Sequence, residues 1–310
     1  MSNRRLAFLR TLTLGLALIA SNFLAPRQAK AEFLTMIPPK IETTGTPGQT
    51  ISQSLRVRND GGTVTTYDAA VQDFVAVGDQ GSVDFVDEKA AHTNYALASW
   101  ISISPKTFTL EPNTEQVIGF NIRIPETAEP GGHFASVYVQ SVADPVKGNG
   151  ATVQSRLGSL ILLRVSGNVS EKLSLTNFRT PSKTFKSGPI EFIFRSKNEG
   201  NVHSAPSGTI TITNTIGRKV AEIPLKVANV FPGAEREVST IWESKNLIGR
   251  YTATVVAGYG QNNEPLTSST TFYVFPIWLL AVAGGIIALI FLARINKKRI
   301  RKILHRLTAE

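Results

Sequence analysis

The feature that most constrains this chain is a two-residue alternation of apolar and polar side chains, which recurs along much of its length. Between Ile118 and Ile124, isoleucine and phenylalanine alternate with Gly119, Asn121 and Arg123. The same alternation occurs in residues 51–58, 190–195 and 209–213. A period of two places the apolar side chains on one face of an extended strand, whereas a helical face needs a spacing of three to four residues. We therefore expect half-buried strands in antiparallel sheets.

Turn-forming residues separate these runs at short intervals, and some of the landmarks occur twice. Val57-Arg-Asn-Asp-Gly-Gly62 resembles Ser196-Lys-Asn-Glu-Gly-Asn201, and Gly132-His-Phe-Ala-Ser-Val137 resembles Gly249-Arg-Tyr-Thr-Ala-Thr254. Short strands with regular turns are typical of β-sandwiches. A duplication explains the paired landmarks, and convergent turn chemistry is the alternative.

We expect an all-β part made of two tandem immunoglobulin-like β-sandwiches, over residues 32–167 and 168–273, with the boundary near Gly167-Asn168. The first contains 9 basic and 14 acidic side chains, for a net charge of −5. The second contains 12 basic and 8 acidic side chains, for a net charge of +4. The two predicted domains therefore differ in the sign of their charge.

The beginning of the chain has the organisation of a secretory signal peptide. Three arginines in the first ten residues precede an apolar run over residues 12–24, and Ala29-Lys-Ala31 has the small residues of a cleavage site. That order predicts a signal peptide over residues 1–31 and an exported mature chain. An uncleaved N-terminal anchor is the alternative.

An uncharged apolar segment covers residues 274–293. Twenty helical residues rise about 30 Å, the thickness of a bilayer core. A basic tail follows over residues 294–310. We expect a C-terminal transmembrane helix that contacts the lipid bilayer, with an extracellular N-terminal part and a cytoplasmic C-terminus. The alternative is a helix buried in a globular core.

The formal net charge of +10 is concentrated at the two ends of the chain. Residues 1–31 carry five basic side chains and no acid, and residues 294–310 carry a net charge of +6, which leaves −1 for residues 32–293. This distribution excludes a nucleic-acid-binding surface. The chain has no cysteine, which excludes disulfides, thiolate nucleophiles and cysteine-based zinc sites.

Signatures of catalysis are absent from the sequence. None of the four histidines belongs to a His-Glu-x-x-His motif, and there is no Gly-x-Ser-x-Gly elbow and no phosphate-binding Gly-x-x-x-x-Gly-Lys-Ser/Thr loop. We expect a protein that is not an enzyme and that needs no cofactor or metal. Two questions stay open: whether the acidic loop over residues 79–88 binds a cation, and whether the Asn168-Val-Ser170 sequon is glycosylated.

Four side chains on the predicted strands and corners of the first domain are candidate ligand contacts: Trp100, His133, Phe134 and Tyr138. An exposed aromatic ring can stack on a sugar, whereas an aromatic residue in an alternating apolar pattern is more often part of the core. His133 corresponds to Arg250 in the second repeat, which favours an exposed basic corner over a general base.

Residues 32–167 resemble the N-terminal domain of the WxL-interacting protein family of bacterial cell surfaces. The resemblance is carried by Pro38-Pro-Lys40, Pro47-Gly-Gln49, Val57-Arg-Asn59, Trp100 before a proline turn, Ile122-Arg-Ile-Pro125, Pro130-Gly-Gly-His-Phe134 and the apolar strand from Gly158 to Val165. It implies a first domain that binds peptidoglycan and a second that binds host or partner proteins. Residues 168–273 depart from the family pattern.

From this resemblance and the predicted topology we expect a membrane-anchored cell-surface binding protein. It would present its immunoglobulin-like domains to peptidoglycan or another cell-wall glycan, or to exported surface proteins, as in adhesion. The alternative is a structural or assembly protein that holds exported subunits by strand pairing at a sheet edge. An enzyme with an unrecognised site is the third possibility.

Overall fold

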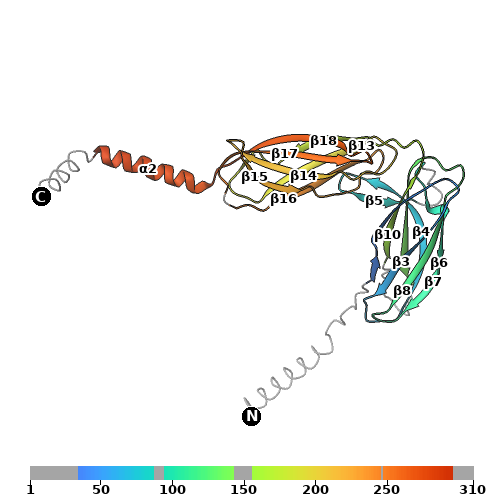
Figure 1. Ribbon diagram of the computed structural model, residues 1–310. Helices are drawn as coiled ribbons and strands as arrows, with labels where there is room; N and C mark the ends of the chain where they lie inside the picture. Colours follow the sequence, from blue (N-terminus) through green and yellow to red (C-terminus); the bar gives the residue numbers. More distant parts are fainter. Residues whose placement is uncertain (1–33, 87–93, 143–155, 246, 296–310) are drawn as a thin grey trace, which may run out of the picture.

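A computed structural model of the chain describes residues 34–86, 94–142, 156–245 and 247–295. The predicted signal peptide at 1–31 and the basic tail beyond residue 295 lie outside this part of the chain. Two β-sandwiches meet at an angle, and a helix leads away from the end of the second sandwich that is remote from the first (Figure 1). The all-β part of the prediction, two sandwiches in tandem, is therefore confirmed.

The first sandwich contains ten strands in two sheets. The strands are β1 (Leu34–Ile37), β2 (Lys40–Gly45), β3 (Thr50–Asn59), β4 (Thr65–Val77), β5 (Ser82–Phe85), β6 (Ile101–Ser104), β7 (Thr107–Leu110), β8 (Glu115–Arg123), β9 (Gly131–Ser141) and β10 (Arg156–Val165). A short 3₁₀ helix, η1 (Ala98–Trp100), precedes β6. One sheet has the order β1-β3-β8-β6, and the other has the order β2-β10-β9-β4-β5, with β7 also pairing with β4.

The chain changes sheets between β1 and β2. Strand β1 pairs antiparallel with β3, whereas β2, which begins three residues after β1 ends, pairs parallel with β10 in the opposite sheet. Pro38 and Pro39 occupy the crossing, where a residue without a backbone N–H breaks no ladder. The alternating apolar residues of both sheets fill the space between them, including Leu55, Ile122 and Leu163.

The second sandwich repeats the layout with eight strands. The strands are β11 (Leu173–Arg179), β12 (Thr184–Phe185), β13 (Ile190–Asn198), β14 (Ser207–Asn214), β15 (Lys219–Pro224), β16 (Glu235–Trp242), β17 (Gly249–Tyr259) and β18 (Glu264–Val274). Its sheets have the orders β11-β13-β16 and β12-β18-β17-β14-β15. The boundary predicted near Gly167 falls in the connection between β10 and β11.

The repeated Asn-acid-Gly turn forms the same hydrogen bonds in both sandwiches. The amide of Asn198 donates to the carbonyl oxygens of Val202 and Val230 at 2.7 and 2.8 Å, and its side-chain oxygen accepts from the Gly200 N–H at 2.9 Å. The amide of Asn59 donates to two carbonyl oxygens, and its side-chain oxygen accepts from a glycine N–H. Both asparagines are buried, so each ties a turn to a neighbouring strand.

The last described element is helix α2 (Ile277–Ile295). Among the residues that the structure describes, no helix has the length and apolar character needed to cross a membrane. Strand β18 runs to Val274 and α2 begins at Ile277, so the first residues of the predicted span at 274–293 belong to the sheet and its connection. The prediction of a transmembrane helix was therefore wrong, and the single-pass membrane location and the bilayer contact are corrected with it.

Candidate functional site

Strand β10 is paired along its whole length on one side and along only part of it on the other. Its pairing with β9 runs from Arg156 opposite Gln140 to Val165 opposite Gly131. Its pairing with β2 begins only at Leu160. Within the described residues, 156–159 therefore have a neighbouring strand on one side alone, and we call this segment the free edge of β10.

The direction of the backbone groups in the free edge follows from its neighbours. The N–H of Leu160 donates to the Pro39 carbonyl at 3.1 Å, and that of Ser166 donates to the Gly45 carbonyl at 2.9 Å. Backbone groups of successive residues in a strand point to opposite sides. The N–H and C=O groups of Arg156 and Gly158 therefore point away from β9, toward the open side.

Small and apolar side chains surround this segment. A Cβ atom on Gly158 would lie 2.5 Å from the Ser136 hydroxyl, so the position is restricted to glycine by a neighbouring strand. The half-buried Leu157 packs against the core of the first sandwich. Strand β1 approaches β10, and its last residue, Ile37, keeps 56% of its surface exposed. The hydroxyl of Ser159 donates to the Pro38 carbonyl at 2.8 Å. This hydrogen bond connects the last residue of the free edge to the chain just before β2.

Of the four predicted ligand contacts, only Tyr138 lies beside the free edge. Its ring lies under the guanidinium of Arg156, with Cζ 3.5 Å from the ring centroid. Trp100 is half-buried, and its ring centroid lies 4.4 Å from that of His133. His133 is buried, and its two ring nitrogens lie 3.0 Å and 3.1 Å from backbone carbonyl oxygens. The assignment of these residues, with Phe134, as ligand contacts stays a prediction.

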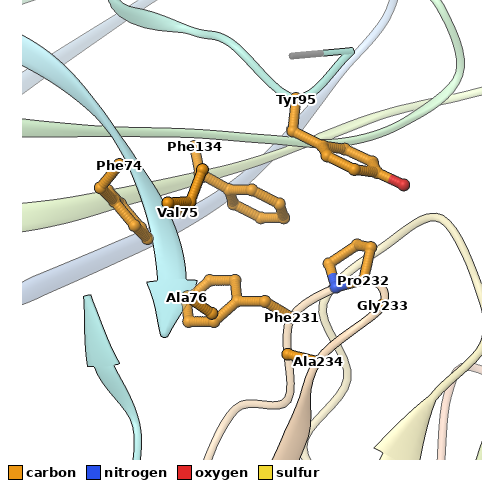
Figure 2. A pocket seen from close by; sticks show the side chains of 9 residues that line it. All are labelled: Phe74, Val75, Ala76, Tyr95, Phe134, Phe231, Pro232, Gly233 and Ala234. Carbon is orange, nitrogen blue, oxygen red and sulfur yellow. The ribbon is translucent and has the colours of Figure 1, made fainter. Parts of the chain in front are cut away.

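Phe134 belongs to an apolar cluster where the two sandwiches meet. Its ring centroid lies 5.0 Å from that of Phe231 in the second sandwich, and Phe74 of β4 lies 5.4 Å from Phe231. Beside these rings is a cavity of about 350 Å³, which Tyr95 and Pro232 also line (Figure 2). The edge-to-face contacts of Phe231 with Phe74 and Phe134 give the junction an apolar centre.

Polar contacts surround this apolar centre. Asp79, at the tip of the β4–β5 hairpin, forms an ion pair with Arg195, and its carbonyl accepts from the Glu237 N–H at 2.7 Å. Asn229 of the second sandwich donates to the Glu42 carboxylate at 2.7 Å. Asp79 of the acidic loop is thus an ion-pair partner, and no group of three potential metal ligands occurs in the described part of the chain.

His203 lies at the edge of the junction, with its ring centroid 5.6 Å from that of Phe134. Burial lowers the pKa of His203 below its ordinary value of 6.5, and the positive charges of Lys40 and Arg164 act in the same direction, against the opposing charge of Glu42. Its Nδ1 atom is buried and has no hydrogen-bond partner in the described part of the chain. The folded junction therefore favours the neutral imidazole.

Acidification is expected to destabilise the folded chain through His203. Because the pKa of His203 is lower in the folded chain than in the unfolded chain, the unfolded chain takes up the proton first as the pH falls. The free energy of unfolding should decline below about pH 6.5 and level off below the folded pKa. Denaturant unfolding between about pH 7.5 and 5.5, repeated on His203→Gln, measures this share. An equal decline in the variant would assign the effect to other groups.

Comparisons with known proteins find likeness only at the level of solved structures. No protein-family model matches the chain, and no curated protein matches it. The class 5 fimbriae chaperone CfaA is 15% identical, with a TM-score of 0.39, over 77% of this chain and 99% of its own. The Pseudomonas aeruginosa CupB2 chaperone is 14% identical, with a TM-score of 0.34, over 76% of this chain and 98% of its own. A structure of the Salmonella enterica SafA pilin in complex with the SafB chaperone gives 11% identity and a TM-score of 0.36, over 79% and 98%.

The predicted resemblance to the WxL-interacting protein family was wrong. No family model matches the chain, and the similar solved structures named above contain fimbrial chaperones. The motifs that suggested it are short turns rich in proline and glycine, which unrelated sandwiches share. The expected role as a membrane-anchored surface protein that presents its domains to peptidoglycan or another glycan came from that resemblance and the predicted topology, and it is withdrawn with them.

Proposed function

We propose that this chain is a non-enzymatic assembly protein that holds another exported protein by strand pairing at the free edge of β10. The observation that carries the proposal is the one-sided pairing of residues 156–159. Two sets of backbone donors and acceptors, on Arg156 and Gly158, point to a side where no described strand accepts or donates. An extended segment of a partner would satisfy them.

The place that such a partner strand would occupy has a definite geometry. It would lie in line with β2 in the sheet, because the pairing of β2 with β10 begins only at Leu160. One face of the partner strand would lie beside Leu157, which packs against the core, so apolar side chains are expected there. Main-chain hydrogen bonds would supply affinity, and the alternate side chains would supply selectivity.

The described sheets have several strand edges, and two of them are steps within a sheet: the free edge of β10, and residues 264–272 of β18, which pair with β17 while β12 pairs with β18 only at Tyr273 and Val274. The outer strands β6 and β15 end a sheet along their whole length. The free edge of β10 is instead a step within a sheet, flanked by β9 and lying beside the start of β2. A strand bound there would pair with β10 along one side and meet the start of β2 at one end.

The proposal rests on this step in the sheet rather than on the distant likeness to fimbrial chaperones. One of those similar structures holds a chaperone in complex with a pilin, and strand pairing with an exported subunit is a role of the same kind. The predicted secretory signal, which lies outside the described residues, is the reason for expecting an exported partner.

Proline at position 158 is the direct test. In Gly158→Pro the ring replaces the outward N–H with a bulky group on the open side and leaves the hydrogen bonds to β9 in place. Gly158→Ala is the matched control, because both variants bring the same Cβ crowding with Ser136. Full-length chain is isolated from its own cells after crosslinking, and Gly158→Pro is expected to retain at least about ten-fold less exported protein than Gly158→Ala, which has the same Cβ crowding but keeps the outward N–H.

Amide hydrogen exchange on the isolated complex identifies the contact directly. The N–H groups of Arg156 and Gly158 should become protected when the partner is bound. Equal capture by the proline and alanine variants, with no added protection of these two amides, would show that the partner does not pair with this edge.

A further inference from the structure

The first residue of β10, Arg156, lies flat across the outer face of its sheet. Its Cζ atom is 3.5 Å from the ring centroid of Tyr138 and 4.7 Å from that of Phe85, and its Nη2 group donates to the side-chain oxygen of Gln72. The three partners belong to β9, β5 and β4. One guanidinium therefore connects the end of β10 to three other strands of the sheet.

The arrangement depends on a gap between the strands. Gly158 lies opposite Tyr138 in the β9–β10 register, and it has no side chain to cover the ring. A Cβ atom there would lie 3.3 Å from the Cβ atom of Tyr138. The glycine thus leaves one face of the tyrosine ring open, and the planar guanidinium of Arg156 covers it, as planar cations do on aromatic faces.

The free edge of β10 needs such a contact because its own pairing is weak. Residues 156–159 are paired as a strand with β9 alone, and a strand end paired on one side opens more easily than a strand paired on both. A cation–π contact at an exposed site changes an equilibrium by about two- to five-fold. Two such contacts and a hydrogen bond together give a substantial bias toward the closed strand.

We propose that Arg156 is the positioning residue that keeps the free edge of β10 extended and paired with β9, and therefore ready to accept a partner strand. This inference rests on the proposed function. An edge that is already ordered loses less conformational freedom on binding, so the arginine strengthens binding although its side chain points to the outer face of the sheet.

Amide hydrogen exchange on the full chain without any partner tests the positioning role. In Arg156→Ala, the amides of Leu157 and Ser159, which point toward β9, are expected to exchange about ten-fold faster. The amide of Leu163, on the same strand but paired with β2 and β9, should not change. Arg156→Lys keeps the charge without the planar group and should give an intermediate rate. Arg123→Ala, an exposed arginine of β8 in the other sheet, is the control.

The aromatic partners give a second variant with an expected effect of the same kind. Tyr138→Leu should accelerate the same two amides, though less than Arg156→Ala does, and the double variant should match Arg156→Ala, because the arginine substitution already removes the Tyr138 contact together with those to Phe85 and Gln72. The positioning role is overturned if Leu157 and Ser159 exchange at wild-type rates in both single variants, or if all of β10 accelerates equally.

Failure of this inference is distinguishable from failure of the proposed function, because the exchange measurement uses no partner. Faster local exchange in Arg156→Ala supports the positioning role even where Gly158→Pro leaves partner capture intact. Unchanged exchange in Arg156→Ala overturns the positioning role even where Gly158→Pro abolishes capture. Where the proposed function stands, partner capture by Arg156→Ala should fall about five-fold and that by Arg123→Ala should not.

Discussion

Replacing Asn198 with alanine is expected to lower the free energy of unfolding of the second sandwich by about 3 to 5 kcal/mol. The side chain is 1% exposed and makes three hydrogen bonds to backbone groups. Alanine would leave the carbonyl oxygen of Val202 and the N–H of Gly200 without this partner, and the carbonyl of Val230 would keep only the Ser204 N–H. Each buried polar group that loses its partner costs about 1 to 3 kcal/mol, so the loss exceeds that of an ordinary surface substitution.

Urea unfolding followed by fluorescence or circular dichroism measures this loss. Asn198→Asp is an informative companion, because it keeps the volume and the acceptor for Gly200 but removes both donors; it should destabilise the sandwich by a comparable amount. Asn177→Ala, at an exposed position of β11, should change the free energy by no more than about 0.5 kcal/mol. A loss below about 1 kcal/mol for Asn198→Ala would mean that the turn is held by other contacts.

The second large effect is expected at the junction. Phe231→Ala should remove about 3 kcal/mol of coupling between the sandwiches, because the ring is 9% exposed and packs against Phe74 and Phe134 of the other domain. The two sandwiches should then unfold in separate steps. Each should keep its own strands, since Phe231 lies in a connection outside the strands of the second sandwich.

Small-angle X-ray scattering and calorimetry measure the loss of coupling between the two sandwiches. The radius of gyration should increase, and a single calorimetric transition should broaden or split. Phe275→Ala is the matched control: it removes a phenylalanine that is 57% exposed, and both measurements should stay at wild-type values. An unchanged scattering profile for Phe231→Ala would assign the angle between the sandwiches to the polar contacts around Asp79 and Asn229.

The alternating pattern predicted strands well and strand partners poorly. A run such as 118–124 determines which side chains face the core, and the structure places Ile118, Phe120 and Ile122 there. The same pattern does not predict which strands pair with each other. The crossing of β1 and β2 between opposite sheets was therefore not foreseen, because both halves show ordinary strand residues on either side of Pro38-Pro39.

The candidate site was missed for a related reason. A free edge depends on where the neighbouring strand begins. The residue types of Arg156, Leu157 and Gly158 do not indicate that position. One signal was present: the strand changes at residue 160 from Arg-Leu-Gly-Ser to the fully apolar Leu-Ile-Leu-Leu163. That change coincides with the start of the pairing with β2.

The prediction for residues 274–293 failed at the boundary between elements. Apolar character alone did not separate the end of a strand from the start of a helix. Val274 is fully buried in the core of the second sandwich and lies opposite Gly249 in the register of β18. A buried strand end and an apolar helix have similar composition. The predicted span therefore combined the end of β18 and the start of α2 in one segment.

The parallel pairing of β2 with β10 has a consequence for synthesis on the ribosome. Residues 40–45 lie against residues 160–165, so the second sheet of the first sandwich stays incomplete until Val165 has been made. Contacts between such distant segments form late, because the entropy of closing a long loop is lost before the contacts lower the free energy. The first sandwich is therefore expected to fold as one unit after β10 has been synthesised, rather than strand by strand. Until then, β2 has no strand with which to pair.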